Sequence, residues 1–164
     1  MAAENSFVSV ELSRKIQAGL EELQIVRRQF EPLLSIPPDA EPGVIVTSAA
    51  CAMLHSFYTE IEKILKIIAR EWDGLLPASE AWHRDLLIQM SEPTAKRPAV
   101  LSDDSLPILK EFLAFRHLFR GASIALMRWN KLHPLVEKVE SVYSRVSGEM
   151  GDFVRFLDDH TDAD

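Results

Sequence analysis

The stretch from Val44 to Trp72, VIVTSAACAMLHSFYTEIEKILKIIAREW, decides the fold class. Its apolar residues recur every three or four positions, which is the spacing that places side chains on one face of an α-helix. Asp73-Gly74 is expected to end this helix, because glycine is favoured just after a helix C-terminus. The predicted buried stripe of the helix consists of Val46, Ala49, Ala50, Met53, Phe57, Ile61, Ile64, Leu65 and Ile68.

The flanking segments predict further helices and no strand. Three prolines and a glycine in SIPPDAEPG separate an N-terminal amphipathic segment from the stretch above. The further helices are expected at about Val8–Leu34, at about Glu80–Met90, from Ser102–Ser105 to about Met127, and at about Pro134–Leu157. The sequence therefore predicts an all-α, up-and-down bundle of about five helices. It would be a single domain over residues 1–164 with loose ends at about 1–7 and 158–164.

The overall composition indicates a globular protein with an acidic balance. Hydrophobic residues make up 47% of the 164 residues, and the formal net charge of -7 argues against broad, nonspecific attraction to nucleic acid. The N-terminus lacks the basic and apolar regions of a signal peptide. No apolar run approaches the roughly 20 residues that cross a bilayer. We therefore expect a cytoplasmic protein with no membrane association.

Metal and cofactor chemistry have little support in the sequence. Cys51 is the only cysteine, so neither an internal disulfide nor a multi-cysteine metal site can form. The histidines lie on different predicted elements without the spacing of a metal motif, and no glycine-rich phosphate loop is present. No metal or cofactor is expected. The histidines are His55, His83, His117, His133 and His160.

The stretch from Lys110 to Leu132, KEFLAFRHLFRGASIALMRWNKL, places charge on an otherwise apolar helix. Arg116 and Arg120 follow the apolar residues at three- and four-residue steps, so they point where the helix buries apolar surface. One interpretation is an anion site, in which the guanidinium groups hold a phosphate and His117 transfers a proton.

The other interpretation of this stretch is structural. The arginines would pair with Glu60 or Glu62 of the Val44–Trp72 helix, or with a partner chain, and spacing alone favours this second interpretation. Tyr58 and Glu62 lie one turn apart on the same helix, so their polar edge could also line a groove with Arg116.

Four blocks cover roughly Leu54 to Glu140 in this order: LHSFYTEIEKILKIIAREWDGLLP, AWHRDLLIQM, RPAVLSDD and LKEFLAFRHLFRGASIALMRWNKLHPLVEKVE. Together they resemble the HepT-like branch of the HEPN superfamily. The resemblance implies a small helical bundle, usually a homodimer whose composite groove is a metal-independent endoribonuclease site. Many members are toxins partnered by a minimal nucleotidyltransferase antitoxin. A second copy of the chain, such an antitoxin and RNA are therefore the expected partners.

The family's motif is an Arg with a polar follower and a His a few residues later. In the HepT branch a Tyr, which the antitoxin can adenylylate, stands two positions after that His. Carried over to this sequence, the Arg falls on Arg116, the polar follower on His117 and a second basic residue on Arg120. The motif His falls on Gly121 and the Tyr on Ser123. Glycine has no side chain to transfer a proton, so the resemblance implies a degraded or altered active site.

Three functions are compatible with this pattern. The first is a relative of ribonuclease toxins whose site, with Arg116, His117 and Arg120 as candidate catalytic residues, is altered. The second is a non-catalytic dimeric interaction module that binds a nucleotidyltransferase or another protein. The third is an active metal-independent endoribonuclease that uses Arg116 and His117.

Overall fold

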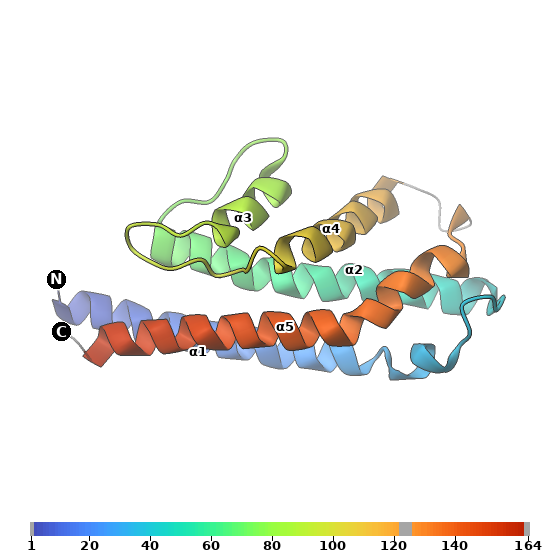
Figure 1. Ribbon diagram of the computed structural model, residues 1–164, viewed down its shortest axis with the longest axis horizontal. Coiled ribbons are helices and arrows are strands. Elements are labelled where there is room, and N and C mark those ends of the chain that lie inside the picture. Colours follow the sequence, from blue (N-terminus) through green and yellow to red (C-terminus); the bar gives the residue numbers. More distant parts are fainter. Residues whose placement is uncertain (1, 122–125, 163–164) are drawn as a thin grey trace.

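The computed structural model describes residues 2–121 and 126–162 and shows an elongated bundle of helices (Figure 1). Three long helices lie side by side, and two shorter helices cover one face of them. The described residues contain no strand, so the all-α prediction is confirmed. The helices are α1 (Ala2–Arg28), η1 (Glu31–Ser35), α2 (Gly43–Ile68), η2 (Ala69–Asp73), α3 (Trp82–Ser91), α4 (Ser105–Gly121) and α5 (Trp129–Asp162).

Helix α2 is central and contacts all four of the other α-helices. Most of its predicted stripe is buried, but Ala49 is exposed, because the buried face at this end runs through Thr47, Ala50 and Cys51 instead. α1 approaches α2 closely, since a Cβ at Gly19 would lie 2.6 Å from Ile64 Cγ1. Small residues at a helix contact thus set how near the two axes come.

The continuous helix Gly43–Asp73, formed by α2 and the π-helical segment η2, is long and apolar enough to cross a membrane by length and composition. Its most apolar window has a mean hydropathy of 1.3. This corrects the expectation that no apolar run approaches the required length. In this fold the helix lies at the centre of the bundle, where an apolar composition is also expected. The helix ends at Gly74, whose φ of 70° is left-handed, as predicted.

Helical structure extends further toward both ends than the sequence predicts. α1 begins at Ala2 and α5 continues to Asp162, so helices run into the segments, at about 1–7 and 158–164, that were expected to be loose. The two helices run antiparallel, and their ends meet at the same end of the bundle (Figure 1). The Ser13 hydroxyl donates to Asp158 at 3.3 Å. Each terminal helix therefore has a neighbour to pack against, which stabilises turns that would fray in isolation.

The junction of α4 and α5 also differs from the prediction. The fourth helix was expected to reach Met127, but Met127 is not helical, and α5 begins at Trp129 rather than at Pro134. The Trp129 indole N–H donates to the Pro37 carbonyl at 2.7 Å, which anchors the first turn of α5 to the loop before α2. Pro134 therefore lies inside the helix, a position that spacing and proline preference alone do not predict.

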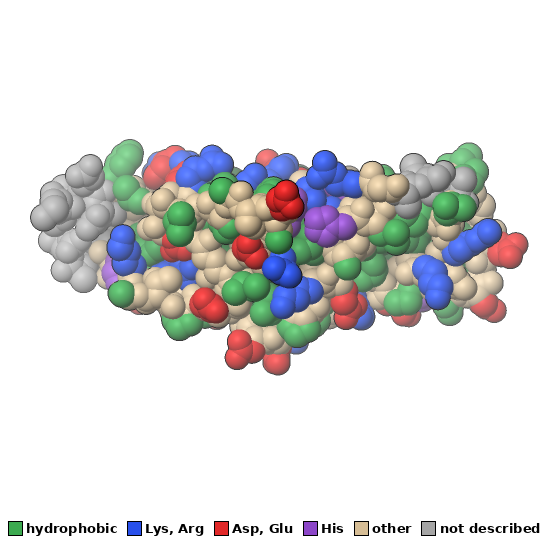
Figure 2. Space-filling view, turned by 90° about the horizontal axis from the view of Figure 1, so that it is seen from above, with side chains coloured by type: hydrophobic (Ala, Val, Ile, Leu, Met, Phe, Trp, Pro, Cys, Tyr) green, Lys and Arg blue, Asp and Glu red, His purple; other side chains and the backbone are tan. Residues whose placement is uncertain are grey.

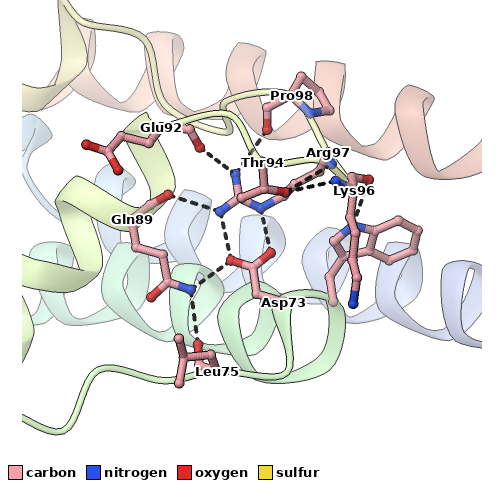
Figure 3. A network of polar contacts seen from close by, with 9 residues as sticks. Asp73, Leu75, Gln89, Glu92, Thr94, Lys96, Arg97 and Pro98 are labelled. Carbon is pink, nitrogen blue, oxygen red and sulfur yellow. Dashed lines mark hydrogen bonds and ion pairs between the residues drawn. The ribbon is translucent and has the colours of Figure 1, made fainter.

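The loop between α3 and α4 is fixed by the buried side chain of Arg97 (Figure 3). Its Nε and Nη2 each donate to one carboxylate oxygen of Asp73 at 2.7 Å. Nη1 donates to the carbonyls of Glu92 and Pro98, and Nη2 also donates to the carbonyl of Gln89, each at 3.0 Å. All five guanidinium N–H groups are thus used. The loop is held against the end of η2, which positions α3 beside α4.

Candidate functional site

Helices α2, α3 and α4 bring one buried arginine, one carboxylate and one histidine together. Arg116 Nη1 lies 3.1 Å from His83 Nε2, and His83 Nδ1 lies 2.6 Å from Glu62 Oε2. Arg116 Nη2 is 3.8 Å from Glu62 Oε1, which is an ion pair but too long for a hydrogen bond. All three side chains are buried, and together with Tyr58 we call them the Arg116 cluster.

The hydrogen bonds of His83 determine its tautomer. A guanidinium can only donate, so His83 Nε2 must accept from Arg116, and the imidazole proton must be on Nδ1, which donates to Glu62. Burial lowers the pKa of His83 and outweighs the opposing effect of the Glu62 carboxylate, which supports a neutral ring. A neutral imidazole therefore links the cation of α4 to the carboxylate of α2.

The Arg116 cluster contains buried polar atoms that have no hydrogen-bond partner. They include Arg116 Nε, and His55 Nδ1 on α2 is another, whereas the Tyr58 hydroxyl is close enough to Glu62 for a hydrogen bond to contribute to its raised pKa. Burial raises the pKa of Tyr58, and the neighbouring Glu62 carboxylate raises it further, so the phenol stays protonated at neutral pH. Because buried polar groups are normally paired, these atoms leave hydrogen-bonding capacity unused in the cluster.

His117 and Arg120 lie on the exposed side of this cluster. The His117 ring meets the His83 ring edge-on, with 5.5 Å between the ring centroids. Arg120 lies one turn further along α4, close enough that its charge, after burial and the charge of Arg116, lowers the pKa of His55. The three predicted site residues therefore lie close together. Arg116 is inside the Arg116 cluster, and His117 and Arg120 are at its surface.

The pairing expected under the structural interpretation is present for one arginine. Arg116 pairs with Glu62, whereas Glu60 binds Lys63 at 2.8 Å. Among the described residues, no ion pair joins Arg120 to a carboxylate. Arg116 is therefore partly structural, and Arg120 keeps its charge for solvent or a ligand.

Gly121 and Ser123 are the positions where the family's His and Tyr would stand. Gly121 is the last described residue of α4 and is exposed, and among the described residues no atom outside its own helix backbone lies within 4 Å of a Cβ built on it. A side chain would fit there, but the glycine supplies no group that can transfer a proton. Ser123 lies outside the described residues.

His83 and its neighbour Trp82 belong to this site although the sequence analysis did not single them out. Both stand at the start of α3, and the indole of Trp82 stacks on the imidazole of His83 with 3.6 Å between centroids. No spacing rule connects a residue of the third helix with Arg116 of the fourth. In the part of the chain that the structure describes, no group of three His, Cys, Asp or Glu residues could hold a metal ion.

Comparison with protein families gives the class of this helical protein. The family described as HepT-like protein matches residues 49–157, which run from α2 through most of α5 and include the whole Arg116 cluster. The chain therefore belongs to the HepT-like family, as the blocks of sequence indicated, and this agrees with a place in the HEPN superfamily. Neither the curated proteins nor the solved structures include a match to the chain.

Proposed function

We propose that this HepT-like protein is an altered relative of endoribonuclease toxins that binds RNA through Arg116, His117 and Arg120. The supporting observation is the state of Arg116. Its guanidinium is buried, makes one hydrogen bond to His83, and keeps Nε without a partner. Phosphate oxygens are the acceptors that suit such unused guanidinium donors, because they can accept two N–H groups at once.

Cleavage in the manner of the family is not expected from the unmodified site. RNA hydrolysis through the 2′-hydroxyl requires a group that takes up its proton, and Gly121 supplies none. His83 cannot take over, because its Nε2 lone pair already accepts from Arg116. His117 is exposed beside the cluster and is the remaining candidate. An active endoribonuclease that uses Arg116 and His117 is therefore the second candidate function.

A homodimer or a nucleotidyltransferase partner is part of this proposal. Large apolar side chains are exposed near the start of α2 and near the end of α4, and these two helix ends lie toward the same end of the bundle (Figure 1). Exposed apolar groups rimmed by polar ones favour association with another protein surface. Light scattering should give about twice the chain mass of 18.5 kDa at micromolar concentrations, and a monomer would contradict the dimer. The side chains are Val44, Ile45, Leu118 and Leu126.

The proposed function is tested by incubating the purified protein with single-stranded RNA in EDTA. We expect binding without cleavage by the wild-type protein, and at least about tenfold weaker binding after Arg116→Ala or Arg120→Ala. Arg120 is exposed, so its substitution should leave folding intact. The matched control is Arg14→Ala on the exposed face of α1. Binding that is equally strong in all four proteins would refute the proposal.

Cleavage is tested in the same assay. If the wild-type protein cuts RNA in EDTA and His117→Ala stops it, the second candidate function is correct. If it does not cut, the double variant Gly121→His, Ser123→Tyr restores the family's motif. At Gly121 a Cβ would meet no described atom outside its own helix backbone, so the backbone does not exclude a side chain at this position. A double variant that folds and still neither cuts RNA nor becomes toxic would argue against descent from an endoribonuclease site.

A further inference from the structure

Trp82 forms the outer wall of the Arg116 cluster. One face of its indole stacks on His83, with 3.6 Å between ring centroids and planes inclined by 28°. The ammonium of Lys66 lies 5.1 Å from the indole centroid. Since the imidazole occupies one face, the ammonium must cover the other. Trp82 and Lys66 are both only partly buried, so both side chains lie at the surface of the bundle.

The indole is held rigidly on its inner side and weakly on its outer side. His83 is fixed by its hydrogen bonds to Glu62 and Arg116, so the ring beneath Trp82 cannot easily turn. Lys66, in contrast, is held over the indole by a partly exposed cation–π contact, which is one of the weaker side-chain contacts. A flat ligand could therefore replace the ammonium without disturbing the ring below, and the platform is preorganised for it.

Positive charge surrounds this aromatic platform in a chain that is acidic overall. Lys63 and Lys66 of α2 and Arg70 of η2 follow one another at three- and four-residue steps along this continuous helix. Arg84 on α3 and Arg120 on α4 are exposed. Figure 2 looks onto the face that carries α3 and α4, and it shows Lys and Arg side chains gathered along one long edge of it.

Some of this positive charge is neutralised locally. Glu60 binds Lys63, and Asp85 lies 3.7 Å from Arg84. In the described residues, no carboxylate forms an ion pair with Lys66, Arg70 or Arg120. The cations nearest the platform therefore remain available for a polyanion, and such a local basic surface is compatible with a negative net charge.

We propose that Trp82 is a stacking platform for one unpaired base of a single-stranded RNA whose phosphates contact Lys66, Arg116 and Arg120. This inference rests on the proposed function and names the part of the RNA that the site recognises. Every base has a flat π-face, and stacking of bases on aromatic side chains is the usual way in which proteins hold single strands. When the base takes the place of the Lys66 ammonium, the flexible lysine stem lets the charge turn toward the adjacent phosphate.

An RNA strand fits this arrangement better than an acidic peptide does. A peptide carboxylate would pair with the cations, but it has no flat ring to stack on the indole face opposite His83. A base and its phosphate use both the ring and the surrounding charges. Only the imidazole of His83 separates the indole of Trp82 from the guanidinium of Arg116. The two groups are therefore close together, as the base and the phosphate of one nucleotide require.

The test measures the affinity of the full-length protein for two fluorescent strands of equal length and charge. One is oligoadenylate and the other is the same ribose-phosphate chain without bases. The wild-type protein should bind oligoadenylate about tenfold more tightly than the abasic strand. Trp82→Leu should lower the affinity for oligoadenylate to that for the abasic strand, while Trp82→Phe, which keeps an aromatic ring, should retain most of the preference. Arg120→Ala should weaken binding of both strands.

The other possible results contradict either the base platform alone or the proposed RNA binding as well. If the wild-type protein binds both strands equally, or if Trp82→Leu weakens both equally, Trp82 is not a base platform, although the proposed RNA binding stands. If neither strand binds, the proposed function and this inference fail together. If polyglutamate of the same charge competes for the site as strongly as unlabelled oligoadenylate does, the surface recognises negative charge alone and the inference is wrong.

Discussion

Arg97 and Arg116 are both buried arginines that pair with a carboxylate carried by α2 or by its continuation η2, yet their guanidinium groups are used differently. Arg97 makes five hydrogen bonds to one carboxylate and three carbonyls. Arg116 makes one hydrogen bond and a looser ion pair of 3.8 Å. Burial is similar, at 3% and 8% exposure. The number of unused donors, rather than burial, therefore distinguishes a structural arginine from a candidate binding residue.

The two arginines differ in the number of hydrogen-bond acceptors that surround each guanidinium group. Arg97 sits in a loop whose carbonyls turn inward, so acceptors surround it (Figure 3). Arg116 projects from the middle of α4, where the carbonyls of neighbouring helices are already used within those helices. Among the described residues, its guanidinium hydrogen-bonds to His83 and forms a longer ion pair with Glu62. A helix-borne arginine in a bundle core is thus left with donors that a ligand can use.

The largest expected effect is on stability at Arg97. Arg97→Lys keeps the charge but loses the planar fork, and it leaves several buried acceptors unpaired. We expect a loss of about 3–5 kcal/mol in the free energy of unfolding. Urea unfolding measures this loss directly. Arg116→Lys is the matched variant, and its cost should be only about 1 kcal/mol, since one hydrogen bond is at stake. Equal losses in the two variants would remove the distinction between the arginines.

The second effect is on RNA binding, and here the order of the two variants reverses. Lysine cannot hold a phosphate with two parallel N–H groups, so Arg116→Lys should weaken RNA binding by about tenfold. Arg97→Lys should leave the affinity of the folded protein unchanged, measured at a temperature where the variant remains folded. Fluorescence anisotropy at constant salt provides the measurement. If RNA affinity falls only in the Arg97 variant, Arg97 rather than Arg116 is the RNA-binding arginine.

The third effect is a pH dependence that arises beside Arg116. Burial lowers the pKa of His83 and His55 in the folded protein, so the unfolded chain binds more protons just below the ordinary histidine pKa of 6.5. Stability should therefore fall as the pH drops from about 7 through 6.5. His83→Asn should make this fall shallower in urea unfolding between pH 7.5 and 5.5. A slope that is unchanged in the variant would show that His83 is not held neutral.

The smallest effect is expected at Gly121. Its backbone is helical and nothing lies near a Cβ there, so Gly121→Ala should stabilise the protein by about 0.5 kcal/mol without altering RNA binding. Thermal unfolding detects the change. Destabilisation would mean that a partner or another segment covers this position, and it would remove the basis for placing a histidine there.

The sequence predicted the helices well where a long apolar stripe repeats, as it does along α2 and α5. It missed the boundaries that depend on distant neighbours. Helix α1 packs along α5, and the start of α5 is fixed by Trp129 bound to the Pro37 carbonyl. Neither contact leaves a local pattern in the chain.

Of the candidate site, mainly the residues that α4 contributes could be predicted from the sequence. Arg116, His117 and Arg120 stand out because charge interrupts an apolar face, and the opposing Glu62 was one of two expected partners. His83 and Trp82 were not predicted, since their role depends on how α3 packs against α4. That packing is set by Arg97 in the loop SEPTAKRPAV, whose acceptors are mostly backbone carbonyls without a sequence signal.

The central claim, that Arg116 keeps donors for RNA while Arg97 does not, is tested most directly by NMR of the arginine Nε–H groups. The two resonances are assigned from spectra of Arg97→Lys and Arg116→Lys. When single-stranded RNA is added to the wild-type protein, the Arg116 Nε–H resonance should shift and that of Arg97 should stay in place. RNA that binds without moving the Arg116 resonance would contradict the account.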